Sequence, residues 1–216
     1  VVHPRGAGYS DGPRGDAEDF EAVLADHARF FAELERLSPG PLFLFGHSAG
    51  AAFALDVLTR SPRPIAGLVL VNPAYRFKQT EGMTPTAGQV VQFAVNLIFR
   101  PAAITVDMNS NPDVVAFGPD REEGLAMQRD PLVVRYFSMR FMTAEQRVLQ
   151  SSKKAIATVE APLLFVEGAH DALVDPAGTD ELFALAKSPD KRRLSAPDGG
   201  HGPSAVETMT EPLVEW

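Results

Sequence analysis

Short apolar runs bounded by turn residues indicate where strands are expected. Residues 42–45 (LFLF) and 65–71 (IAGLVLV) are continuous apolar runs, the pattern of parallel strands buried on both faces. Further strands are expected once the alternation of strand and helix returns near residue 160. The strands that we predict cover residues 42–45, 65–71, 163–166 and 192–195, and a short apolar stretch also opens the chain at Val1.

Helical periodicity fills the intervals between these strands. Residues 16–37 place apolar side chains at spacings of three, four and seven, which corresponds to one buried helical face. Thr143 opens a capping box, and Asp175 directly before a proline has the form of a helix N-cap. We predict helices over residues 16–37, 49–58, 89–99, 143–157, 176–187 and 204–216.

Between the two strand-containing parts lies a long block without a clear strand. From Ala74 to about Glu160 the sequence has the pattern of helices and loops. Strand and helix alternating on both sides of such a block predict an α/β fold, in which a mostly parallel sheet is flanked by helices and carries an inserted helical cap. We therefore expect the first part of the core at residues 1–73, the cap at 74–158 and the second part of the core at 159–216.

Composition and charge exclude several classes of protein. With 216 residues, 45% hydrophobic and 22% charged, the chain has a globular composition. Its formal net charge of −8 offers nothing to a phosphate backbone, so nucleic acid is not an expected partner. Cysteine is absent, which removes disulfides, thiol catalysis and thiolate metal sites. No apolar run approaches the roughly 20 residues of a membrane span. We expect a cytoplasmic location, although a preceding segment could hold a signal peptide.

The segment Gly46-His47-Ser48-Ala49-Gly50 carries the chemistry. It follows a predicted strand and opens a predicted helix, which is the context in which G-x-S-x-G indicates a nucleophilic serine. A sharp turn there exposes the Ser48 hydroxyl and points the backbone N–H of Ala49 at a developing oxyanion. Both flanking glycines are expected because side chains would collide at the turn. The alternative is a glycine-flanked serine that only caps a helix.

A serine needs a histidine to accept its proton. His201 follows the last predicted strand on a glycine-rich loop, PDGGHGP, where a catalytic imidazole is expected. His27 lies on an apolar helix face and His47 points away from the serine, so both have packing explanations. His3 comes too early in its strand and loop, and His170 neighbours a better-placed acid. We predict His201 as the base; the alternative is a loop histidine without a role.

The carboxylate that orients the histidine should follow a core strand and lie between serine and histidine in the chain. Asp171 and Asp175 both meet this condition. Asp175 precedes a proline and has a sufficient role as a helix N-cap. We therefore predict Asp171, against the alternative that it only makes local hydrogen bonds in a turn.

Other patterns are too incomplete to indicate a cofactor or a metal. Gly6-Ala7-Gly8 lacks the third glycine of a dinucleotide-binding loop, and no phosphate-loop sequence occurs. Residues 107–111 open like a calcium loop, but the glycine and the bidentate glutamate that such a loop needs are missing. We expect a reaction that requires neither.

Ser48, Asp171 and His201, in that order, resemble the α/β-hydrolase superfamily. Within it, HPRGAGYSDGPRG, LVLVNPAYR and RDPLVVRYFSMRF are similar to segments of the monoacylglycerol lipase-like group, which includes lysophospholipases and enzymes classed with serine aminopeptidases. Some positions differ from the group's pattern, including His3, His27, Ala49 and Ala51. The resemblance also implies that strands before Val1, and the loop that supplies a second oxyanion N–H, are absent from this chain.

The resemblance predicts a serine hydrolase that cleaves carboxylic esters through an acyl-enzyme, with monoacylglycerols or lysophospholipids as favoured substrates. Ser48 would attack, His201 would transfer the proton, Asp171 would hold the imidazole and Ala49 would bind the oxyanion. Alternatives are a thioesterase, peptidase or perhydrolase with the same triad, or an inactive fragment or binding domain. The cap should form the acyl pocket, and its helix near residues 90–99 could touch lipid weakly. We expect the 216-residue piece alone to be poorly stable and nearly inactive.

Overall fold

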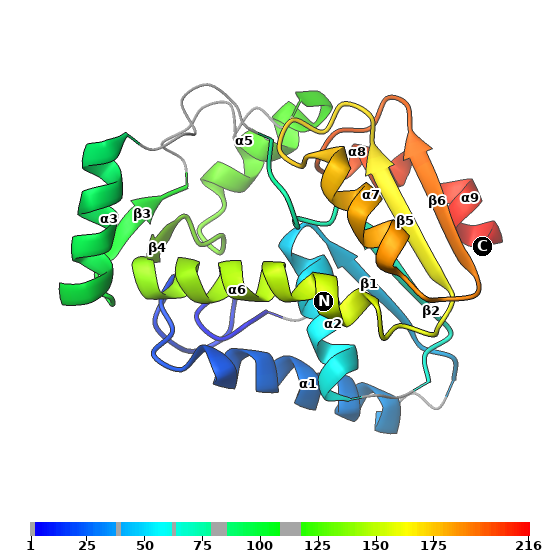
Figure 1. Cartoon of the computed structure of the whole chain (residues 1–216), viewed down its shortest axis with the longest axis horizontal. Helices are drawn as coiled ribbons and strands as arrows, with labels where there is room; N and C mark the ends of the chain where they lie inside the picture. The colour runs from blue at the N-terminus through cyan, green and yellow to red at the C-terminus, as the bar shows by residue number, and fades with distance from the viewer. Residues whose placement is uncertain (1–2, 38–39, 62–63, 79–85, 109–117) are drawn as a thin grey trace.

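A four-stranded parallel sheet forms the centre of the computed structural model (Figure 1). The structure describes residues 3–37, 40–61, 64–78, 86–108 and 118–216. The strands, in spatial order, are β1 (Phe43–His47), β2 (Gly67–Val71), β5 (Leu163–Gly168) and β6 (Lys191–Ala196). All neighbouring pairs are parallel, which confirms the predicted α/β class and its four strands. Val1 and Val2, which the sequence places in a further strand, lie outside the described residues.

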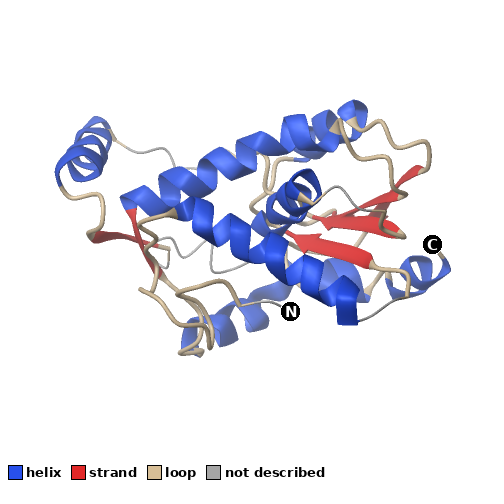
Figure 2. Ribbon diagram, turned by 90° about the horizontal axis from the view of Figure 1, so that it is seen from below, coloured by secondary structure: helices blue, strands red, loops and turns tan. Residues whose placement is uncertain are grey.

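The two central strands are buried on both faces. Leu68 and Leu70 of β2 face a core shared with helices α2 and α6, whereas Val69 and Val71 face the opposite side. This alternation of faces within an all-apolar strand is what the continuous run IAGLVLV requires. Helices therefore cover both sides of the sheet (Figure 2). They are α1 (Phe20–Leu37), α2 (Ala49–Arg60), α6 (Met139–Ile156) and α7 (Pro176–Leu185), with α8 (Ser204–Glu207) and α9 (Thr210–Glu215) on the second face.

Strand β1 is an edge of the sheet within the described part of the chain, since β2 is its only described partner. Phe43 and Phe45 are 61% and 51% exposed on this strand. Among strands of the same sheet β1 is thus much less covered than β2, whose five residues are all buried. Large apolar side chains on an open strand edge favour association with other chains.

The segment between β2 and β5 contains two strands that the sequence did not predict. β3 (Ile104–Asp107) and β4 (Tyr136–Ser138) pair antiparallel, beside α3 (Ala87–Phe99), a short 3₁₀ turn η1 (Gly118–Asp120) and α5 (Arg121–Arg129). The expectation of no clear strand here was wrong because each strand is only three or four residues long, which is too short to produce a periodic pattern. The division into core and cap at residues 73 and 158 stays a prediction.

Helix α6 begins earlier than the predicted capping box at Thr143. Ser138 is its N-cap, because the Ser138 hydroxyl accepts the Phe141 N–H at 3.1 Å. The Thr143 hydroxyl instead donates to the Met139 carbonyl inside the helix, 2.8 Å away. The predicted N-cap at Asp175 is confirmed, since its carboxylate accepts the Ala177 N–H at 3.0 Å. At the end of the chain, the expected single helix is two short ones, α8 and α9.

Candidate active site

Ser48 lies at the turn between β1 and α2 with a strained backbone. Its φ of 54° and ψ of −124° fall in a region that non-glycine residues rarely occupy. The Ser48 N–H donates to the Val71 carbonyl at 2.9 Å, and the Ser48 carbonyl accepts N–H groups from Ala51 and Ala74. These bonds hold the turn in place at the carboxyl end of β1, so the hydroxyl is presented beyond the end of the sheet.

The two glycines around Ser48 are not equivalent. A Cβ on Gly46 would lie 2.6 Å from the Ala51 Cα and from the Gly50 carbonyl oxygen, so this position requires glycine. A Cβ on Gly50 would meet no described atom within 4 Å. The expectation that both glycines are needed for steric reasons is therefore correct for Gly46, and the described residues give no steric reason for Gly50.

His201 joins Ser48 to Asp171. Its Nε2 lies 2.9 Å from the Ser48 Oγ, and its Nδ1 lies 2.8 Å from the Asp171 Oδ2. A carboxylate can only accept, so Nδ1 carries the proton and Nε2 is left to accept the hydroxyl proton of Ser48. His201 and Asp171 are each 6% exposed. The structure thus brings together the three residues that the sequence predicts, in the order required for proton transfer from the serine.

Asp171 is held as an anion by its surroundings. Burial by itself raises the pKa of the Asp171 carboxyl, but the hydrogen bond and charge of His201 and two backbone N–H groups lower the pKa below its usual value. The donors are Leu173 and Val174, at 2.7 and 2.9 Å from Oδ1. Asp175, the alternative acid, caps α7 and pairs with Arg76 at 3.1 Å. The turn therefore separates an acid that faces the histidine from one that serves the helix.

Two side chains that the sequence did not assign to the site fix the loop of His201. His47 Nε2 lies 2.5 Å from the His201 carbonyl oxygen, and Asn72 Nδ2 donates to the same oxygen at 3.1 Å and to that of Gly200 at 2.9 Å. The Asn72 Oδ1 accepts the Gly168 N–H at 2.9 Å, so this buried amide connects the ends of β2, β5 and β6. Burial lowers the pKa of His47, which favours the neutral imidazole.

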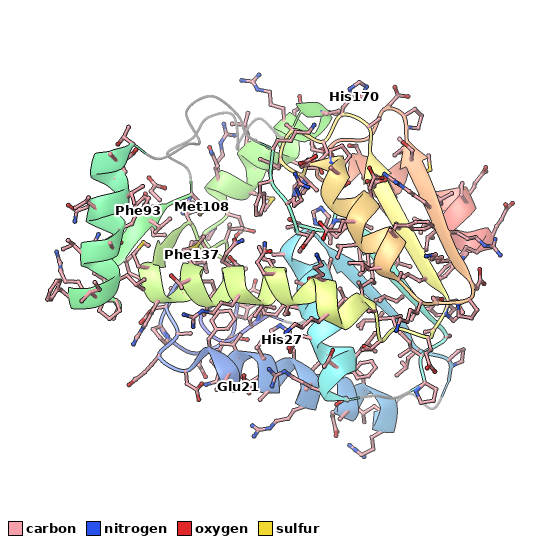
Figure 3. All side chains as sticks on the ribbon, in the orientation of Figure 1. Glu21, His27, Phe93, Met108, Phe137 and His170 are labelled. Atoms are coloured by element: carbon pink, nitrogen blue, oxygen red, sulfur yellow. The ribbon has the colours of Figure 1, made fainter. Side chains whose placement is uncertain are left out.

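The remaining histidines lie elsewhere. His27 packs on Phe53 and contacts the Val23 carbonyl at 2.8 Å, which confirms the packing interpretation. His3 accepts the Tyr9 N–H, and His170 is exposed at the outer rim of the molecule (Figure 3). Within the described residues, no group of three or more histidine and acidic side chains could hold a metal ion.

The parallel sheet, with the site at the carboxyl ends of its strands, defines an α/β-hydrolase fold. A serine, a histidine and an aspartate are in hydrogen-bond contact at this site. A family model described as "Serine aminopeptidase, S33" matches residues 2–207, and the chain belongs to this family. Human monoglyceride lipase is 29% identical over 195 residues, which are 86% of this chain and 60% of the relative. Phospholipase YtpA of Bacillus subtilis is 27% identical over 178 residues, which are 79% of this chain and 63% of the relative.

Solved structures show the same fold at low sequence identity. A monoglyceride lipase of Saccharomyces cerevisiae superimposes with a TM-score of 0.78 at 20% identity, over 99% of this chain and 74% of that one. A monoacylglycerol lipase of Paleococcus ferrophilus gives 0.70 at 24% identity, over 98% and 79% of the two chains. The chain spans about 60% of the length of the curated monoglyceride lipases it matches. No helix in the described part of the chain is long and apolar enough to cross a membrane.

Proposed function

We propose that the protein is a serine hydrolase that cleaves carboxylic esters through an acyl-enzyme. The observation that carries the proposal is the chain of two hydrogen bonds from Ser48 through His201 to Asp171, with lengths of 2.9 and 2.8 Å. This arrangement activates a hydroxyl that is otherwise a weak nucleophile. The lipase relatives support the same class of reaction.

In the acylation half-reaction, the Ser48 Oγ attacks the ester carbonyl carbon while His201 Nε2 takes the hydroxyl proton. The imidazolium that forms is stabilised by the Asp171 carboxylate at Nδ1. Collapse of the tetrahedral intermediate breaks the ester C–O bond, and His201 returns the proton to the leaving alcohol. Ser48 is then esterified by the acyl group.

Deacylation repeats the sequence with water as the nucleophile. His201 removes a proton from water, the hydroxide adds to the acyl carbonyl, and release of Ser48 yields the carboxylic acid. The N–H of Ala49, at the first residue of α2, is our candidate for an oxyanion donor. Within the described residues no backbone carbonyl accepts this N–H, so it is available for an oxyanion. The second donor stays a prediction.

We place the acyl chain against apolar side chains that start beside Ser48. Ala49 belongs to a packed cluster with Phe20 and Phe53. Phe20 stacks edge to face on Phe141, with ring centroids 5.2 Å apart, and Phe141 lines a mainly apolar cavity of about 370 Å³ that Phe137 also lines. These apolar contacts, which extend from Ala49 to the cavity at Phe141, support a fatty acyl ester, such as a monoacylglycerol or lysophospholipid, as the substrate.

We further propose that α3 contacts a lipid interface. Its sequence, AGQVVQFAVNLIF, has no charged residue, and Val91, Ile98 and Phe99 are 63%, 70% and 76% exposed. The helix lies at the end of the molecule farthest from the sheet (Figure 1). An exposed apolar helix of this kind is suited to shallow insertion at a membrane surface. The cytoplasmic location expected from the sequence stays a prediction.

The direct experiment is covalent labelling with a fluorophosphonate, using the protein as its gene encodes it. We expect labelling of the wild type and none in Ser48→Ala, and a large loss of rate in His201→Ala. A panel of monoacylglycerols, lysophospholipids, thioesters and aminoacyl amides then separates the ester reaction from thioesterase and peptidase activity. Failure of the folded wild type to label, or labelling that survives His201→Ala unchanged, would overturn the proposal.

A further inference from the structure

Asp120 is a buried acid in the segment between β3 and α5 whose contacts are on the loop of His201. It is 2% exposed, and its carboxylate accepts two backbone N–H groups, from Gly202 at Oδ2 and from Ser204 at Oδ1, both at 2.8 Å. Asp120 also occupies the N-cap position of α5, but its side chain makes no capping hydrogen bond there. The helix therefore does not explain why this carboxylate is buried.

The 3₁₀ turn that ends at Asp120 contacts both the loop that carries Asp171 and the loop that carries His201. A Cβ on Gly202 would lie 2.8 Å from the Asp120 Cγ, so this position must stay small for the carboxylate to reach the loop. At the other end of the turn, Gly118 has a φ of 62° and lies against the His170 carbonyl, the residue next to Asp171. Contacts on both loops make this turn part of the site's frame.

The loop of His201 is thereby held from two directions. His47 and Asn72 donate to its carbonyl groups from the sheet, and Asp120 accepts its N–H groups from the segment that the sequence assigns to the cap. Burying a carboxylate is costly unless it is hydrogen-bonded, and the two N–H groups supply charge-assisted bonds of the stronger kind. Removing the charge leaves this side of the loop without its anchor.

We propose that Asp120 is a positioning residue that sets the direction of the His201 imidazole toward Ser48. The proposal rests on the hydrolase function proposed above. Its physical basis is that the 2.9 Å approach of Nε2 to Oγ depends on the backbone of the loop that carries His201, which Asp120 holds directly after His201, at the N–H groups of Gly202 and Ser204. A displacement of the imidazole by about 1 Å is enough to slow proton transfer by one to two orders of magnitude.

The test is Asp120→Asn in the protein as its gene encodes it, with Asp16→Asn as the matched control. An asparagine amide can accept only one of the two N–H groups and turns its own donor toward the other. We expect kcat and the rate of fluorophosphonate labelling to fall roughly 10- to 100-fold, with KM nearly unchanged. Asp16 also bonds to the segment between β3 and α6, through Ser138, but has no contact with the His201 loop among the described residues. Its variant should keep kcat.

Combining each variant with His201→Ala separates positioning from a general loss of structure. If Asp120 acts through His201, Asp120→Asn lowers the rate in the wild-type background and causes no further loss in His201→Ala. An equal loss in both backgrounds would overturn the inference. So would wild-type kcat in a folded Asp120→Asn protein, even though Ser48 still labels and the hydrolase proposal stands. An unlabelled wild type would instead overturn the hydrolase proposal, and this inference with it.

A second variant keeps the test decisive if Asp120→Asn folds poorly. Gly202→Ala retains the carboxylate but places a methyl group against it, so the carboxylate must move away from the loop. We expect the same fall in kcat with little change in KM. Unchanged kcat in this variant, with the protein folded by circular dichroism, would count against a positioning role for Asp120.

Discussion

His201 Nε2 lies 2.9 Å from Ser48 Oγ although the two residues are 153 positions apart in the chain. Ser48 follows β1 and the loop of His201 follows β6, while Asp171 follows β5 between them in sequence. In a parallel sheet all of these strand ends lie on the same edge. The topology thus brings three distant loops together, and side-chain and backbone hydrogen bonds then set their fine geometry.

The strained turn at Ser48 predicts opposite effects of one substitution on activity and on stability. Ser48→Gly removes the nucleophile but relieves a backbone conformation that costs non-glycine residues about 1–3 kcal/mol. We expect the free energy of unfolding of Ser48→Gly to be about 1 kcal/mol larger than that of Ser48→Ala, which keeps the strain. Urea unfolding of both variants measures the difference, and both should be inactive. Equal unfolding free energies would argue against strain at this position.

The two acids after β5, Asp171 and Asp175, should respond very differently in kcat to the same substitution by asparagine. Asp171→Asn removes the charge that stabilises the imidazolium and can present the wrong group to Nδ1, so kcat should fall roughly 10⁴-fold. Asp175→Asn keeps a good N-cap and should change kcat less than twofold, with stability altered by about 0.5 kcal/mol. Steady-state ester hydrolysis and thermal unfolding check both. Similar losses of kcat in the two variants would contradict the assignment of Asp171.

The sequence predicts the four described strands of the sheet and selects the three side chains that lie in contact, Ser48, His201 and Asp171, because each depends on a local signal. β2 and β5 were readable as continuous apolar runs, and G-x-S-x-G is informative once it falls between a strand and a helix. The choice of Asp171 over Asp175 depended on a local cap next to a proline. Signals of this kind lie within a few residues and survive without knowledge of the fold.

What the sequence could not indicate depends on contacts between distant segments. Asn72 was visible only as a residue that closes a strand, but its φ of 43° and its bonds to Gly168 and Gly200 exist only when the sheet is assembled. Asp120 has no local motif at all. The pairing of β3 with β4 joins residues about 30 positions apart through strands too short for periodicity. Of these features, only Asn72 left a hint in the sequence, because an asparagine directly follows a buried strand there.

The ion pair of Asp16 with Arg140 predicts a pH-dependent loss of stability. The Arg140 guanidinium holds the pKa of Asp16 below the ordinary value of 3.8, and a lowered pKa stabilises the fold at pH values above that value. Asp16→Asn should therefore cost about 2 kcal/mol of unfolding free energy at pH 7. The difference from wild type should shrink as the pH falls below about 4, because the carboxyl of the unfolded chain takes up a proton there while the native carboxylate, with its lowered pKa, is protonated only at lower pH. Urea unfolding at pH 7 and at pH 3 measures it, and a constant difference would contradict the prediction.

Exposed apolar residues on α3 predict a dependence of activity on the physical state of the substrate. Ile98→Glu places a charge on a residue that is 70% exposed on the helix proposed to touch lipid. We expect a several-fold loss of activity on monoacylglycerol in vesicles and no change on a short, monomeric ester, because insertion of a charge into a lipid interface is unfavourable. Val214→Glu is the matched control, since Val214 is 82% exposed on α9, near the C-terminus and away from α3 (Figure 1). Equal losses on both substrates, or in both variants, would argue against lipid contact through α3.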